Sequence, residues 1–242
     1  MGSNLKSLGI IGGLGPMATA YFMQLMIEMT DAKTDQQHIE MIVYNAPSTP
    51  DRTSYILGES QENPVIPMIE IGNKLAGEGV DYIAIPCITA HYFHEELQQK
   101  IPVPIIHGIF ETVNYLAQRG YKRVGVMATD GTVQSGLFTE QLNQKDMDCV
   151  YPSAKCQQFV MDIIYRNVKA GIPIDMDKFR EVSEELFANG AQVILLGCTE
   201  LSMAKRDEHI GPGFLDVMEV LAKAAVERCG TLKKEYEELI TK

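Results

Sequence analysis

Two of the five cysteines, Cys87 and Cys198, stand in closely matching local sequences. The first lies in AIPCITAH (84–91) and the second in LLGCTEL (195–201), so each follows an apolar segment and precedes a threonine. A thiol between a buried strand and a helix N-terminus meets the positive end of the helix dipole, which favours its thiolate form. Two such thiols on opposite sides of one carbon atom could remove a proton from one face and return a proton to the other. The pattern therefore predicts racemisation by an acid–base pair of cysteines.

The other three cysteines, Cys149, Cys156 and Cys229, lack this context and are interpreted as small buried side chains. The odd number, the wide spacing and the absence of any Cys-x-x-Cys pair argue against a disulfide framework and against a zinc site. With no recognisable secretory signal, we expect a cytoplasmic location.

The chain has 242 residues and a formal net charge of -11, which disfavours nucleic acid and anionic membranes as partners. No apolar run approaches the roughly 18 residues needed to span a bilayer. An acidic small-molecule substrate remains compatible with this charge, because a pocket can be locally basic.

Apolar segments of strand length alternate with helical patterns along the chain. Strands are predicted at 8–12, 39–45, 81–86, 103–106, 123–128 and 191–196, and helices at 16–29, 66–78, 89–100, 110–119 and 216–228. Such alternation predicts an α/β fold with parallel sheets flanked by helices on both faces. Ligands of these sheets bind beyond the carboxyl ends of the strands, where both cysteines are expected.

The second half of the chain repeats the first, since 123–128 is similar to 7–12 and 191–196 is similar to 81–86. We therefore expect two pseudo-symmetric domains. The predicted division assigns 1–105 plus 214–242 to the first domain and 106–213 to the second, with the last helix packing back on the first half.

Six short motifs resemble the aspartate/glutamate racemase family, of the aspartate racemase type, over nearly the whole chain. They are GGLGP with Ala18-Thr19, PDRT (50–53), PCITAH (86–91), ATDGT (128–132), KAG (169–171) and LGCTEL (196–201). The resemblance implies two flavodoxin-like domains with the active site in the cleft between them. It also implies a homodimer that needs neither pyridoxal phosphate nor a metal and interconverts the enantiomers of aspartate or glutamate.

The resemblance assigns roles to single residues. Cys87 and Cys198 match the catalytic thiols, and Arg52 and Lys169 match basic positions that handle an acidic substrate, as the guanidinium fork would allow. The other positions expected to contact the substrate are Leu14, Gly15, Ile88, Thr89, Thr129, Thr132, Thr199 and Glu200. The family usually has Asn where this chain has Ile88, which removes an amide donor and leaves aspartate, glutamate and a wider substrate range open.

Three alternatives stay open. Gly13 to Ala18 fits the Gly-x-Gly-x-x-Ala turn of a dinucleotide-binding oxidoreductase, although the second strand ends at Asn45 rather than at an acidic residue. Related carbon-acid enzymes, such as a hydantoin racemase, a maleate isomerase or an arylmalonate decarboxylase, share the superfamily, and the decarboxylases resemble a one-cysteine version. Cys87 and His91 could also share a helix face as metal ligands, although two ligands make a poor zinc site.

Overall fold

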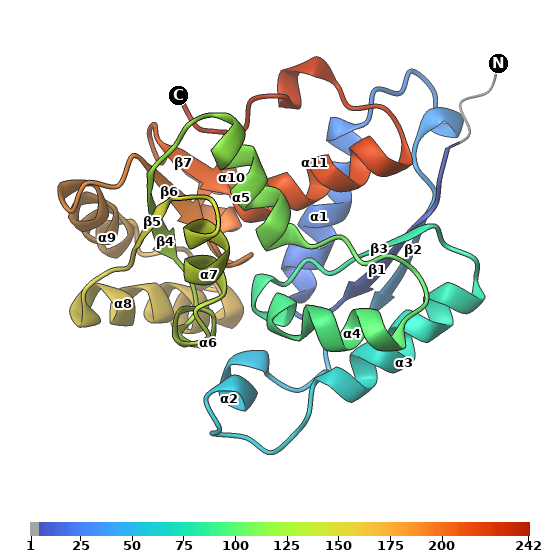
Figure 1. The fold of residues 1–242 in the computed structure, drawn as a ribbon, viewed down its shortest axis with the longest axis horizontal. Helices are drawn as coiled ribbons and strands as arrows, with labels where there is room; N and C mark the ends of the chain where they lie inside the picture. The colour runs from blue at the N-terminus through green and yellow to red at the C-terminus, as the bar shows by residue number, and fades with distance from the viewer. Residues whose placement is uncertain (1–4) are drawn as a thin grey trace.

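Two parallel sheets form the framework of the protein (Figure 1). A computed structural model describes residues 5–242. The first sheet has the order β2-β1-β3 and the second the order β5-β4-β6-β7. The strands are β1 (Leu8–Gly12), β2 (Met41–Asn45), β3 (Tyr82–Ala84), β4 (Arg123–Met127), β5 (Asp148–Val150), β6 (Val193–Leu196) and β7 (Phe214–Asp216). All pairings between these strands are parallel, which confirms the predicted fold class.

Helices flank both sheets. The α-helices are α1 (Pro16–Met29), α2 (Arg52–Ile56), α3 (Val65–Gly77), α4 (His94–Lys100), α5 (Gly108–Gln118), α6 (Asp130–Gln134), α7 (Leu137–Asn143), α8 (Ala154–Met161), α9 (Met176–Ala188), α10 (Ser202–Asp207) and α11 (Val217–Cys229). Shorter helical turns are η1 (Asp35–Gln37), η2 (Ile88–Phe93), η4 (Val168–Ala170) and η5 (Lys234–Tyr236), and η3 (Asp162–Asn167) is a π-helix.

Most predicted elements are confirmed within two residues, and three predictions are wrong in detail. The helix expected over 89–100 is two elements, η2 and α4. The strand expected at 103–106 is a single bridge between Ile83 and Ile105, too short to form a strand. Residues 214–216, assigned above to the first domain, form β7 and pair with β6, so they belong to the second sheet.

Helix α11 joins the two halves. It packs against both α1 and α5, and most of its residues are buried. The contact with α1 is the packing on the first half that we predicted for this helix. One hydrophobic core accordingly runs through both halves and includes Phe22, Val126 and Leu221, which are fully buried. The carboxyl ends of β3 and β6 are thereby held in a common framework.

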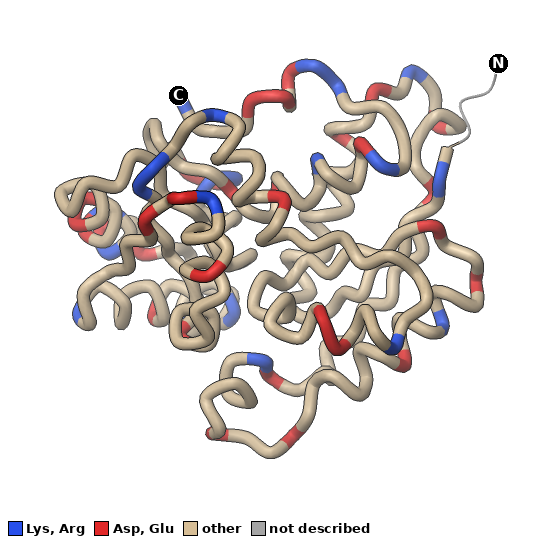
Figure 2. The backbone as a smooth tube through the Cα atoms, in the orientation of Figure 1, with Lys and Arg blue, Asp and Glu red and all other residues tan. Residues whose placement is uncertain are grey.

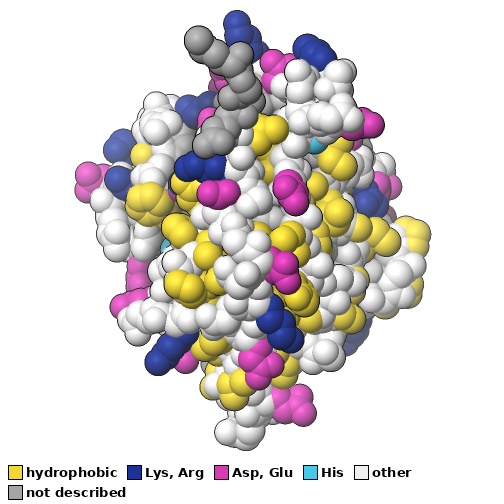
Figure 3. Space-filling view, turned by 90° about the vertical axis from the view of Figure 1, so that its right-hand side faces the viewer, with side chains coloured by type: hydrophobic (Ala, Val, Ile, Leu, Met, Phe, Trp, Pro, Cys, Tyr) yellow, Lys and Arg dark blue, Asp and Glu magenta, His cyan; other side chains and the backbone are white. Residues whose placement is uncertain are grey.

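The surface carries charges of both signs. Lys and Arg alternate with Asp and Glu along the backbone (Figure 2). On the side of the molecule where β2 forms the sheet edge, hydrophobic side chains lie among charged ones (Figures 1 and 3). Within residues 5–242, no helix is long and apolar enough to cross a bilayer.

A buried acidic pair lies where β7 meets α11. Asp216 is fully buried and accepts hydrogen bonds from Ser202 Oγ (2.8 Å) and from the backbone N–H of Met218 (2.9 Å). Glu219 pairs with Lys205, which also donates to the carbonyl of Leu239. Burial raises the pKa of Glu219 to about 7, and the nearby charge of Asp216 adds to the effect.

Replacing Glu219 by Gln should stabilise the protein more at pH 8 than at pH 5. A carboxyl group whose pKa is raised on folding binds its proton more tightly in the folded state, so its stabilisation is complete below the ordinary value of 4.5 and is lost as the pH rises through about 7. The difference should approach 3 kcal/mol, since each pKa unit corresponds to about 1.4 kcal/mol. Urea denaturation of both proteins across this pH range measures it, and a pH-independent difference would contradict it.

Candidate functional site

Cys87 and Cys198 line the same inner cavity, each just beyond the carboxyl end of a strand. The cavity has an empty volume of about 260 Å³ and takes its walls from both halves of the chain. Its lining residues are Leu14, Asp51, Arg52, Thr53, Cys87, Ile88, Thr89, Thr129, Tyr165, Lys169, Cys198, Thr199 and Glu200. The structure thus brings together all the residues predicted above for the site except Gly15 and Thr132, and these two contact residues of the lining.

The surroundings of the two thiols differ, although their sequences match. Cys87 is the N-cap residue of η2, as the pattern predicted. Cys198 is followed by a turn, and α10 begins only at Ser202. Burial raises the pKa of Cys198 well above its ordinary value, and Glu200 raises it further while Lys169 lowers it. The predicted lowering of this thiol's pKa by a helix N-terminus is therefore wrong.

The Arg52 side chain is buried beside Cys87. Its Nη1 donates to the carbonyls of Thr49 (3.2 Å) and Pro50 (2.9 Å), and its Nη2 donates to the carbonyl of Leu14 (2.8 Å). Burial acts to lower the pKa of Arg52, but Cys87, Asp51 and Tyr165 together raise it. The guanidinium is thus a fixed positive charge next to one thiol. Its Nε is buried and has no hydrogen-bond partner among the residues that the structure describes.

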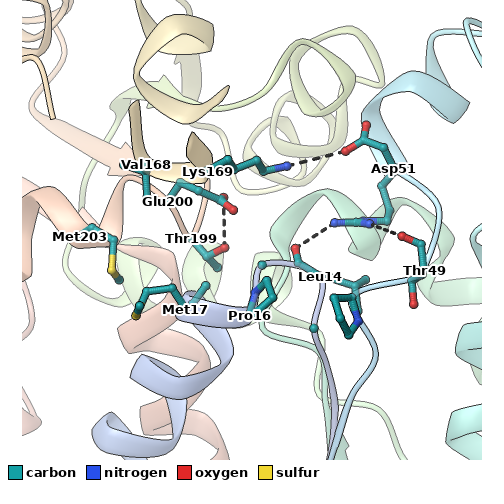
Figure 4. Close-up of a pocket in the computed structure, with 15 residues that line it drawn as sticks. Leu14, Pro16, Met17, Thr49, Asp51, Val168, Lys169, Thr199, Glu200 and Met203 are labelled. Atoms are coloured by element: carbon teal, nitrogen blue, oxygen red, sulfur yellow. Dashed lines mark hydrogen bonds and ion pairs between the residues drawn. The ribbon is translucent and has the colours of Figure 1, made fainter. Parts of the chain in front are cut away.

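Lys169 lies on the opposite wall, and its side chain extends toward Asp51 (Figure 4). Its Nζ is 3.6 Å from a carboxylate oxygen of Asp51 and 4.2 Å from the ring centre of Tyr165. Burial acts to lower the pKa of Lys169, but Glu200, Tyr165, Cys198 and Asp51 together raise it. The ammonium group is therefore held in its charged form within reach of the second thiol.

Three threonine hydroxyls form a closed ring across the two halves. Thr89 follows Cys87 in η2, whereas Thr129 and Thr132 belong to the first turn of α6. Their oxygens are 3.0, 3.2 and 3.1 Å apart, and all three side chains are buried. Hydroxyl groups can rotate to donate to a new acceptor, so the ring can offer hydrogen bonds to a substrate carboxylate.

An outer pocket opens beside the inner cavity and shares Leu14, Arg52, Lys169 and Glu200 with it. Its empty volume is about 870 Å³, part of which is open to solvent. Figure 4 shows Met17 and Met203 on one side of this pocket, opposite the polar groups of the other wall. The outer pocket therefore adjoins the cavity of the two thiols and has a partly apolar wall.

The glycines of the β1–α1 turn are explained by close contacts. Gly15 has a φ of 137°, and a Cβ there would lie 2.9 Å from Oε1 of Glu200. A side chain at this position would displace Glu200 from the site. The turn that fits a dinucleotide motif thus makes room for Glu200, which lies in the loop after β6, and β2 ends at Asn45 without the acidic ribose partner.

His91 does not lie with Cys87 in a cluster of metal ligands. Its ring stacks on His107, with 5.3 Å between the ring centres, and lies near His94. Burial lowers the pKa of His91 well below its ordinary value, so the ring is held neutral. Within residues 5–242, no group of three or more His, Cys, Asp and Glu side chains is placed to hold a metal ion.

Three polar residues of the inner cavity, Asp51, Thr53 and Tyr165, were not predicted as site residues. Asp51 caps α2 by accepting from the backbone N–H of Ser54 (2.9 Å), and the Tyr165 hydroxyl is 3.3 Å from the Asp51 carboxylate. Asp51 lies directly before Arg52, and Tyr165 lies four residues before Lys169. This helical spacing is the signal that could have indicated Tyr165.

Comparison with known proteins identifies relatives over most of the chain. The family model described as Asp/Glu/Hydantoin racemase matches residues 11–225. The chain is 27% identical over 223 residues to the broad specificity amino-acid racemase RacX of Bacillus subtilis, covering 90% of this chain and 96% of that protein.

Solved structures show the same fold. The aspartate racemase of Picrophilus torridus superposes with a TM-score of 0.81 at 33% identity, covering 96% of this chain and 97% of that one. A glutamate racemase of Francisella tularensis shares the fold at 17% identity, with a TM-score of 0.67 over 93% of this chain and 81% of that one. With the family model spanning most of its length, the chain belongs to the Asp/Glu/Hydantoin racemase family.

Proposed function

We propose that the protein is an amino-acid racemase in which Cys87 and Cys198 form the acid–base pair, without pyridoxal phosphate or a metal. The observation that supports this proposal best is that the two thiols, which come from the two halves of the chain, line one cavity. Racemisation requires a base on one face of the α-carbon and an acid on the other.

The groups around the thiols suit this chemistry. Arg52 places a fixed positive charge beside Cys87. In one direction Cys87 takes the α-proton, while the thiol of Cys198 donates a proton to the opposite face. The hydroxyls of Thr89 and Thr129 can donate to the substrate carboxylate. Lys169 places a positive charge nearby, which favours the carbanion because negative charge develops there. In the reverse direction the two thiols exchange roles.

The first substrate candidates are aspartate and glutamate. The aspartate racemase of Picrophilus torridus covers nearly the whole chain, and the cavity contains the cations Arg52 and Lys169. A broader range of amino acids is the second candidate. It is supported by Ile88, which offers no amide donor, and by the methionines Met17 and Met203 of the outer pocket. The homodimer and the cytoplasmic location remain predictions.

Incubation in deuterated water with single enantiomers of aspartate, glutamate and neutral amino acids tests the activity. We expect racemisation on chiral chromatography, with one deuterium at the α-carbon of each product molecule, because the thiol that donates exchanges its proton with solvent. Full turnover without deuterium in the product would contradict proton transfer through solvent-exchangeable thiols.

A further inference from the structure

The thiol of Cys198 donates a hydrogen bond to a side chain two residues away. Its Sγ lies 2.9 Å from Oε2 of Glu200, and both side chains are buried. A thiol can donate one hydrogen bond to a carboxylate, whereas a thiolate would place a second negative charge against the same oxygen. The contact is therefore favourable only while Cys198 carries its proton.

Glu200 itself has favourable partners on its other sides. Lys169 lies close enough to feel its charge, and Thr199 Oγ1 donates to Oε2 at 3.4 Å. Oε1 lies against Gly15, at the N-terminus of the 14-residue helix α1, where the helix dipole is positive. The remaining charged or titratable neighbours are Asp51, Arg52 and Tyr165, which line the same cavity. The carboxylate is thus held by the fold and does not depend on a substrate.

Cys87 has the opposite environment. Its neighbour is the buried guanidinium of Arg52, which is fixed by three backbone carbonyls. A guanidinium favours a thiolate, and a carboxylate favours a thiol. The two cysteines, which stand in similar sequences, are therefore paired with side chains of opposite charge.

We propose that Glu200 is a positioning residue that keeps Cys198 protonated in the resting enzyme, so that Cys198 is ready to act as the acid and Cys87 acts as the base in the same turnover. This inference rests on the proposed function and adds a direction to it. A turnover leaves the proton on Cys87 and the negative charge on Cys198 beside Glu200, so the enzyme must return this proton to solvent and take another one at Cys198 before it regains the resting state.

The alternative role for Glu200 is contact with the substrate, as the sequence predicted. A carboxylate repels the carboxylates of an amino acid and could bind only its ammonium group. In that case, replacing Glu200 by Gln would raise KM without changing the ionisation of Cys198. The two roles are thus separated by a measurement on the thiol itself.

The test measures ionisation of Cys198 in a Cys87→Ala background, by its rate of alkylation with iodoacetamide against pH and by thiolate absorbance. With Glu200→Gln, we expect Cys198 to ionise at least one pH unit lower than with Glu200, which is about a tenfold gain in thiolate at a given pH. Glu200→Asp keeps the negative charge, so Cys198 should ionise at a pH closer to that of the protein with Glu200. Glu219→Gln, which removes a buried carboxylate outside the site, is the matched control and should change nothing at Cys198.

In the enzyme with both cysteines, Glu200→Gln should shift the high-pH limb of the kcat/KM profile to lower pH. The shift should equal the change in the ionisation pH of Cys198, because Cys198 must be protonated to act as the acid. Unchanged ionisation of Cys198 in Glu200→Gln would overturn the proposal whether or not the enzyme is active. A shifted ionisation in a protein that racemises no amino acid would support the role of Glu200 and reject the proposed function instead.

Discussion

Replacing Cys87 or Cys198 by alanine is expected to lower racemase activity at least about a thousandfold, since general acid–base catalysis by one group contributes about 10² to 10⁴ and neither thiol has a substitute. Both side chains are buried and small, so the loss of one sulfur atom should leave the fold intact. Chiral chromatography measures the rate, and circular dichroism and thermal unfolding check the fold.

Each single variant should retain a diagnostic partial reaction. In Cys198→Ala, Cys87 can still remove and return a proton on its own face, so the substrate enantiomer that it reaches should exchange its α-hydrogen with deuterated water without racemising. Cys87→Ala should exchange only the other enantiomer, and more slowly, because Glu200 disfavours the thiolate that Cys198 needs to remove a proton. Cys156→Ala is the matched control, because Cys156 is also buried but lines neither the inner cavity nor the outer pocket. Near-normal turnover in either catalytic variant would reject the two-thiol mechanism.

Replacing Gly13 by alanine is expected to destabilise the protein by roughly 3 kcal/mol or more, or to prevent folding. Gly13 has a φ of +87°, and a Cβ there would lie 2.2 Å from the backbone nitrogen of Ala46 and 2.7 Å from that of Pro47. These are main-chain atoms of the segment after β2, so they cannot turn aside as a side chain would. The left-handed backbone adds about 1 kcal/mol for a residue with a Cβ.

The control for this prediction is Gly79→Ala. Gly79 has a φ of +81°, close to that of Gly13, but a Cβ there meets no atom within 4 Å. This variant should lose only about 1 kcal/mol of stability, which is the effect of a left-handed backbone at a residue with a Cβ. Urea denaturation of the two variants separates the effect of backbone conformation from that of the contact. Equal losses of stability would show that the contact with Ala46 and Pro47 is not what requires glycine.

Local patterns in the sequence were sufficient for the framework. Buried parallel strands are continuous apolar segments, and each helix between them has its own periodicity, so β1, β3, β4, β6 and α1 could be predicted without knowledge of their neighbours. Elements with weaker local signals were missed. β5 (DCV) and β7 (FLD) each combine two apolar residues with an aspartate, whereas β3 lies in the longer apolar segment 82–86. The strand with which each of β5 and β7 pairs therefore specifies it.

The sequence by itself indicated that the two thiols would meet at one site. Cys87 and Cys198 each follow a parallel strand, and the carboxyl ends of such strands form the binding edge of the sheet, so their type and position already indicated a pair of thiols. The charge next to each thiol was decided only by the tertiary structure. Arg52 lies far from Cys87 in the chain, and Glu200 turns back toward Cys198 because Gly15 leaves room for it. Protonation depends on burial and on charges a few ångströms away in space, and these distances do not exist until the two halves have packed together.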